Sequence, residues 1–258
     1  MTMNEEETKA FSYAERLLGV AIDVVGAAQV DLTENWNREP KIIALTLLCR
    51  SISNFRAAMI LVREDNVLEA RILNRCIYES ELWIAALRER GVDFIEDMRG
   101  DEAHARRSLA QLTLEISGRH GADTANEGAM QLRGILNNLS EHFPKPKKLH
   151  ADKTAKATVI ELAYVDYARL SLDAVHCSMT ALNRHVTVER ISPEGIEVTV
   201  NVEARIMPTE RLSTILHLCR ALTGAAITAN ELLGFTSMSG KLAAMVEEFD
   251  GNGWVKTD

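Results

Sequence analysis

Apolar residues recur every three or four positions along most of the chain, which is the pattern of amphipathic helices. Pro40 follows a polar stretch and suits the first turn of a helix. Asp65 and Asn66 form so short a turn that the helices on either side are expected to be antiparallel neighbours. The helices predicted in this half are Glu5–Val30, Pro40–Arg63, Val67–Arg90, Asp93–Ser117 and Thr124–Leu139, with Leu109, Leu112 and Ile116 facing the core in the fourth.

A linker at residues 143–149 separates these helices from a second helical region, because its two prolines cannot continue a helix. Beyond the linker the pattern predicts a long central helix over Thr154–Asn183, with apolar residues on more than one side. A second αα element, from Thr209 to Leu233, is expected to close the core, and a last helix is predicted over Lys241–Phe249.

One segment departs from the helical pattern and alternates apolar with polar residues. The alternation runs over residues 186–191 and again over residues 196–203, with Ser192–Gly195 as a turn between them. This pattern predicts a β-hairpin. Because a lone hairpin is marginally stable in water, its valine face is expected to lie against a helix or against a partner subunit, which favours a homodimer.

Together these patterns predict an all-α fold, an up-and-down bundle of about six to eight helices with one inserted β-hairpin. The chain is expected to form a single domain over residues 1–258, with the hairpin insertion at about 186–205 and a flexible tail at about 250–258. Only 14 glycines, 5 prolines and 5% aromatic residues also favour long helices over a many-stranded sheet.

Charge and cysteine content narrow the class of protein further. With 37 acidic and 29 basic residues, the chain has a formal charge of −8, which argues against a surface built wholly to coat nucleic acid. No apolar run predicts a membrane span, and the acidic N-terminus does not resemble a signal peptide, so we expect a cytoplasmic protein. The widely spaced cysteines are expected to be reduced and buried; they are Cys49, Cys76, Cys177 and Cys219.

The predicted helix Val67–Arg90 contains a pair of opposite charges in an apolar stripe. Arg75 and Glu79 are one turn apart and can form an ion pair. Such a pair marks either a structural network that fixes the packing of the helix or a functional site. Arg50 and Ser51, on the antiparallel neighbour, could supply further hydrogen-bond donors.

The predicted helix Thr154–Asn183 contains the second candidate for chemistry. Arg169 and His176 are seven residues apart, nearly two helical turns, and are therefore expected on one side, with Ser171 between them. A histidine that moves protons beside an arginine that stabilises phosphate charge is suited to phosphodiester cleavage without a metal. The alternative is a histidine that is satisfied within the core.

Lysines are concentrated in one part of the chain only. Lys145, Lys147 and Lys148 lie in the linker and could hold a phosphate backbone, or they could be a solvated linker. The other histidines lack metal-ligand spacing, and neither a phosphate-binding loop nor a dinucleotide fingerprint nor a nucleophile elbow is present. The sequence therefore assigns no metal and no cofactor.

The order of these residues resembles a known family. Arg50–Ser51, Arg75 with Glu79, and Tyr167 with Ser171 and His176 resemble an uncharacterised bacterial helical family known only as a domain of unknown function. The Arg169–His176 spacing is also similar to the motif of HEPN proteins, helical bundles that often act as dimeric, metal-independent ribonucleases in toxin–antitoxin and antiphage systems. That resemblance implies catalytic positions at Arg169 and His176, although Leu170 stands where those nucleases usually have a polar residue.

Two functions remain open from the sequence. One is a HEPN-like ribonuclease that cleaves RNA through Arg169 and His176, either contributed by two subunits of a homodimer or joined by Arg75 and Glu79 within one subunit. The other is a non-catalytic interaction or ligand-binding module, in which a polar network of Arg75, Glu79, Ser171 and His176 is structural or holds a small ligand or a partner peptide. The sequence names no partner protein.

Overall fold

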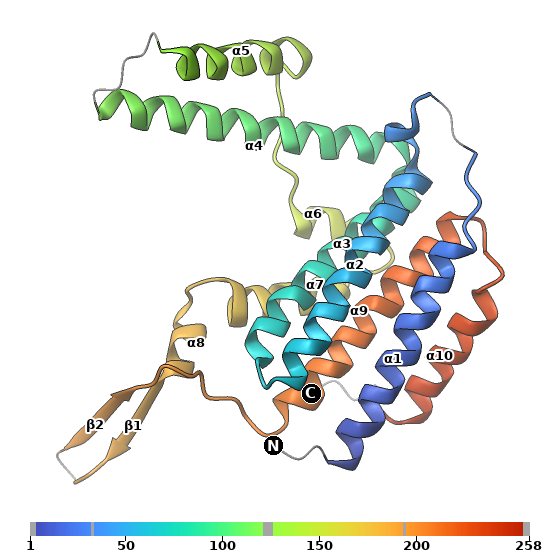
Figure 1. Cartoon of the computed structure of the whole chain (residues 1–258), viewed down its shortest axis with the longest axis vertical. Helices are drawn as coiled ribbons and strands as arrows, with labels where there is room; N and C mark the ends of the chain where they lie inside the picture. The colour runs from blue at the N-terminus through green and yellow to red at the C-terminus, as the bar shows by residue number, and fades with distance from the viewer. Residues whose placement is uncertain (1–3, 32–33, 121–125, 193–194, 255–258) are drawn as a thin grey trace.

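The computed structural model describes residues 4–31, 34–120, 126–192 and 195–254, and its centre is a bundle of long helices (Figure 1). The all-α fold with one inserted β-hairpin is confirmed. The helices of the bundle are α1 (Glu5–Gly26), α2 (Pro40–Arg63), α3 (Val67–Arg90), α9 (Glu210–Leu232) and α10 (Ser239–Gly251).

Local signals explain where the bundle helices begin and end. Asn4 and Glu7 form a capping box at the start of α1, and Pro40 is the first residue of α2. Gly91 ends α3 with a φ of +53°, a conformation that glycine adopts without strain. The predicted bounds of α2 and α3 are therefore confirmed to the residue.

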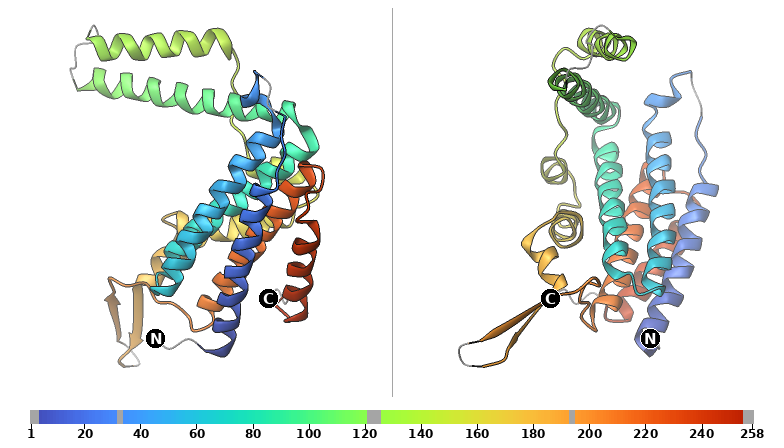
Figure 2. Two further views of the ribbon diagram at one scale, coloured as in Figure 1. Left: turned by 45° about the vertical axis from the view of Figure 1, so that its right-hand side comes forward. Right: turned by 60° about the vertical axis from the view of Figure 1, so that its left-hand side comes forward.

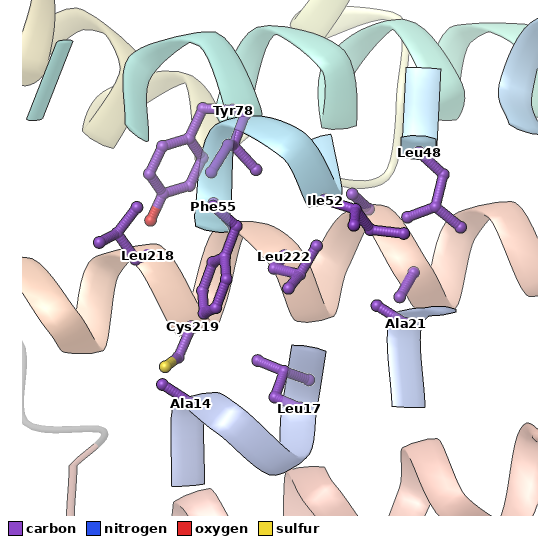
Figure 3. Packing of buried hydrophobic residues seen from close by; sticks show 14 of the residues in the cluster. Ala14, Leu17, Ala21, Leu48, Ile52, Phe55, Tyr78, Leu218, Cys219 and Leu222 are labelled. Carbon is purple, nitrogen blue, oxygen red and sulfur yellow. The ribbon is translucent and has the colours of Figure 1, made fainter. Parts of the chain in front are cut away.

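The core of the bundle forms around α9, which packs against α1, α2 and α3. Figure 3 shows Leu218, Cys219 and Leu222 of α9 between Phe55 of α2 and Leu17 of α1. All five side chains are fully buried, so they supply the hydrophobic stabilisation of the bundle.

Two helices of the chain form an arm outside the bundle. The helices α4 (Val92–Arg119) and α5 (Glu127–His142) lie side by side and project away from it (Figures 1 and 2). The prediction that Leu109, Leu112 and Ile116 face the core is wrong, since all three are exposed, Leu109 by 66%. The helical period gave their shared face correctly, but no other described element covers it. The predicted start of α5 at Thr124 lies outside the described residues.

The predicted central helix over Thr154–Asn183 is wrong, because the segment is broken into short pieces. It contains α6 (Ala151–Lys156), α7 (Ala163–Leu170), a π-helical turn at Ser171–Val175, α8 (Met179–Leu182) and a 3₁₀ turn at Asn183–His185. Hydroxyl groups compete for the backbone here: Thr158 donates to the carbonyl of Ala155, Ser171 to that of Tyr167 and Ser178 to that of Leu172. A further 3₁₀ turn, Trp36–Arg38, precedes α2.

The β-hairpin consists of β1 (Val186–Arg190) and β2 (Ile196–Val200), which pair antiparallel with Val188 opposite Val198. Figure 2 shows it projecting from the bundle. Its valine face does not lie against a helix of the described chain, since Val188 is 60% exposed. Cover by a second subunit stays a prediction. Of the predicted turn, residues 193–194 lie outside the described residues.

Three smaller expectations also meet the structure. Cys219 is buried, but Cys49 and Cys177 are exposed, so the expectation of four buried cysteines is wrong. Where a tail was expected, α10 continues to Gly251 and Trp254 packs against Tyr13; residues 255–258 lie outside the described part. The expected αα element over Thr209–Leu233 is a single helix, α9. By length and composition α2 and α9 could span a membrane, a test that buried core helices also pass, and about half of each such window is buried in the bundle.

Candidate functional site

The helix α3 carries a stripe of polar side chains towards its neighbours α7 and α9. Arg71, Asn74, Tyr78 and Glu81 are spaced at i, i+3, i+7 and i+10 and therefore share one face. On α9, which packs against α3, the residues Thr214, His217 and Gly224 are spaced at i, i+3 and i+10 and also share one face. Polar groups from separate helices thus meet inside the bundle.

A recess of about 100 Å³ lies between α3, α7 and α9. This volume equals that of about three water molecules at ~30 Å³ each, so the recess admits a small polar group. Its walls are formed by nine residues: Arg71, Asn74, Asp166, Arg169, Leu170, Asp173, Ser213, Thr214 and His217.

Arg71 is held in place by carboxylates from two other elements. Its guanidinium donates to Asp173 at 2.5 Å, to Glu210 at 2.9 Å and to the hydroxyl of Thr214 at 3.0 Å. Arg184 binds the same two carboxylates from the other side, at 2.7 Å each. The four charged side chains are 11–16% exposed, so the Coulomb attraction between them is only weakly screened.

The pKa values of this cluster follow from its hydrogen bonds. Burial alone would raise the pKa of Glu210, but hydrogen bonds from Arg184 and from the backbone of Met207 lower it to about 2. The hydrogen bond to Glu210 conversely raises the pKa of Arg184. Both groups are therefore charged over the whole physiological range, and they fix the wall of the recess.

His217 and Asp166 also line the recess, and Tyr78 contacts both of them from outside the lining. The hydroxyl of Tyr78 donates to Asp166 at 3.1 Å, and Nδ1 of His217 lies 3.7 Å from the same carboxylate oxygen. Burial lowers the pKa of His217, with Asp166 opposing this and the nearby arginines adding to it, so the ring is neutral at pH 7. Within the described part of the chain, Nε2 of His217 has no partner.

Asn74 is the exceptional residue of the recess. Its side chain is 0% exposed, and neither its amide nitrogen nor its amide oxygen has a hydrogen-bond partner in the described chain. A buried amide left unpaired costs about 1–3 kcal/mol. Such a group is rare in folded proteins and calls for a specific explanation.

Glu81 lies about two turns beyond Asn74 on α3, where it contacts α9. Its carboxyl group fits only because residue 224 is glycine: a Cβ there would lie 1.9 Å from Oε1. Burial, and the charge of Asp166, raise the pKa of Glu81 well above its ordinary value. The folded protein therefore favours the protonated, neutral form of this carboxyl group up to a higher pH than the unfolded chain does.

The structure brings together four of the residues predicted from the sequence. Arg75 donates to Tyr167 at 2.5 Å, to Ser171 at 3.2 Å and to Glu79 at 3.3 Å, and its guanidinium lies over the ring of Tyr167. Burial raises the pKa of Tyr167, so its hydroxyl stays protonated. Each of the three guanidinium nitrogens of Arg75 donates one hydrogen bond within this network, which joins α3 to α7.

The remaining predicted residues are not part of that network. Arg50 is exposed, and the hydroxyl of Ser51 donates within its own helix, to the carbonyl of Leu47. Arg169 lies at the recess, whereas His176 is exposed on the extended backbone after the π-helical turn. Because the helix ends between them, Arg169 and His176 are not related by two regular turns. Lys145, Lys147 and Lys148 line a separate groove.

Sequence reasoning missed the residues of the recess itself, chiefly Arg71, Asn74, Asp166 and His217. The signal that could have found the first two is the polar stripe along α3, at positions where an amphipathic helix is otherwise apolar. The partners on α7, the π-helical turn and α9 are 88 to 143 positions away in the chain, and only the fold brings them close.

A known protein family matches more than half of this chain. Residues 41–193 match the family of unknown function DUF5677. The chain belongs to this family. Neither a curated protein nor a solved structure matches it. The match contains α3 and α7, which form two walls of the recess, while α9 lies beyond the matched residues.

Proposed function

We propose that this DUF5677 protein is a ligand-binding module whose recess between α3, α7 and α9 holds a small molecule with an anionic group. The observation that carries this proposal is that the buried amide of Asn74, at the wall of a polar recess, has no hydrogen-bond partner among the described residues. A ligand that both donates and accepts a hydrogen bond would satisfy the amide, and its affinity would offset the free-energy cost that Asn74 imposes on the empty fold.

The charges at the recess select the class of ligand. Arg71 is already paired with Asp173 and Glu210, but Arg169 has no hydrogen bond or ion pair within the described part of the chain. Arg169 is exposed, so it lies at the solvent side of the recess. A planar guanidinium binds phosphate and carboxylate groups through paired hydrogen bonds, which favours a ligand bearing one of these groups.

Glutamine in place of Arg169 is expected to abolish stabilisation of the protein by small anions. Inorganic phosphate, acetate and adenosine monophosphate serve as probes in thermal unfolding of the wild type and the variant. A probe at about 100 times its dissociation constant stabilises the folded state by about 2.7 kcal/mol. Arg106→Gln is the matched control, because Arg106 is exposed and lies on the α4 arm. If no probe raises the melting temperature of the wild type more than that of Arg169→Gln, the proposal is wrong.

A second candidate is a metal-independent ribonuclease of HEPN type that uses Arg169 and His176. The observation in its favour is that both side chains are exposed and without a partner in the described chain, so both are accessible to RNA. A histidine acting as general acid or base contributes about 10²–10⁴-fold to a rate.

Alanine in place of His176 is expected, on this second candidate, to lower RNA cleavage at least about 100-fold without changing the thermal melt. His120→Ala is the control, since His120 is exposed at the end of α4. Gel analysis of a labelled RNA with purified wild type and both variants measures the effect. Equal cleavage by all three proteins, or no cleavage by the wild type, would exclude the ribonuclease.

A further inference from the structure

A groove of about 700 Å³ lies between the start of α4 and the linker that follows α5. It is formed by α3, α4, the linker at residues 143–149 and α6, and it shares no lining residue with the recess. We call it the basic groove. Its cationic residues are Arg90, Lys145, Lys147, Lys148 and Lys153.

The acidic residues of the basic groove do not neutralise its lysines. Asp97 pairs with Arg90 at 2.5 Å, and Glu96 pairs with Arg99 at 3.0 Å and with Arg38 at 3.5 Å. The four lysines form no ion pair within the described chain. In a protein with a formal charge of −8, four unpaired ammonium groups in one groove form a local positive field.

The linker that carries three of these lysines is held against α4. Arg107 donates to the carbonyl of Phe143 at 2.9 Å, and the backbone N–H of Leu149 donates to Asp101 at 2.7 Å. Pro144 and Pro146 fix φ between these two anchor points. The lysines are therefore presented by a backbone anchored at both ends, which lowers the entropy lost when a partner binds.

We propose that the basic groove binds a single strand of nucleic acid through its phosphate backbone. Lysines that track a backbone supply affinity without sequence preference, and aromatic rings beside them stack on bases. The rings of His142, Phe143 and His150 line the same groove as the lysines. An acidic peptide would make no use of these rings, and an anionic membrane would need a flat surface rather than a groove.

Fluorescence anisotropy with labelled oligouridine and oligothymidine tests this proposal. Four phosphate contacts predict a slope of about −2.8 for log K against log salt, from about −0.7 for each contact with a single strand. The triple variant Lys145→Gln, Lys147→Gln, Lys148→Gln is expected to reduce the slope to about −0.7 and to weaken binding more than about tenfold at low salt. The matched control changes Lys9, Lys41 and Lys241 to glutamine, since none of them lines the groove.

Each outcome of the anisotropy experiment either supports or overturns binding of a single strand in the basic groove. Binding of either single strand that weakens in the groove variant and not in the control supports the proposal. No binding by the wild type, equal loss in both variants, or tighter binding to a duplex of the same length or to phosphatidylserine vesicles would overturn it. Circular dichroism melts of both variants check folding, and Lys153→Gln, on the opposite wall of the groove, is a second variant expected to reduce the slope by about 0.7. These results are independent of anion binding in the recess.

Discussion

Glutamine in place of Glu81 is expected to raise the free energy of unfolding at pH 7, by an amount that grows as the pH rises. Burial raises the pKa of Glu81 in the folded protein well above 4.5, its ordinary value, which the unfolded chain retains. Between these two pKa values the unfolded chain has lost the proton and the folded protein has kept it. The contribution of Glu81 to stability is therefore fully present below pH 4.5 and declines as the pH rises towards the folded pKa.

The size of this effect follows from proton linkage. Between the pKa of Glu81 in the unfolded chain and its raised pKa in the folded protein, the wild type loses about 1.4 kcal/mol of stability per pH unit relative to Glu81→Gln, which cannot ionise. Urea unfolding of both proteins from pH 5 to pH 8 measures the difference. Glu115→Gln is the control, because Glu115 is exposed on the α4 arm. Parallel stability curves for the wild type and Glu81→Gln would show that Glu81 is ionised in the folded protein.

Methionine in place of Arg71 is expected to lower the free energy of unfolding by about 3 kcal/mol. The change leaves Asp173 and Glu210 with one guanidinium, that of Arg184, where two bound them before. Removing one partner from a buried charge pair costs about 3–5 kcal/mol, and the remaining arginine places this case at the low end.

The matched control for Arg71→Met is Arg106→Met. Arg106 also pairs with a carboxylate, that of Glu102, but both side chains are at least 60% exposed. Exposed pairs contribute about 0–1 kcal/mol, so this variant is expected to unfold almost as the wild type does. Equal losses in the two variants, measured by urea unfolding, would show that the cluster around Arg71 is no more than an exposed salt bridge.

The bundle helices were predictable because their ends carry local signals. Pro40, the turn at Asp65–Asn66 and Gly91 fix α2 and α3 regardless of what packs against them. The segment over Thr154–Asn183 lacks such signals, and its hydroxyl groups compete with the helical hydrogen bonds. Along α4, the helical period correctly placed Leu109, Leu112 and Ile116 on one face. The period of apolar residues cannot show whether another element covers that face.

The site was predictable only in part. The Arg75–Glu79 pair lies within one helix, so spacing alone located it. The resemblance to the helical family singled out Tyr167 and Ser171, but their contacts with Arg75 depend on the fold. The recess depends on how α7 and α9 pack on α3, and no local pattern specifies that packing. The sequence shows that Asn74 is a polar residue within a helix, but only the folded protein shows that its amide has no hydrogen-bond partner among the described residues.

Asn74→Leu is the sharpest test of the proposal that the unpaired amide of Asn74 binds a ligand in the recess. Leucine has a similar shape and no polar atoms, so the ligand-free variant is expected to be more stable than the wild type by about 1–3 kcal/mol. The same variant is expected to lose its stabilisation by phosphate-bearing probes. Urea unfolding with and without inorganic phosphate measures both effects. A ligand-free Asn74→Leu protein that is less stable than the wild type, yet is still stabilised by phosphate to the same extent, would contradict the claim.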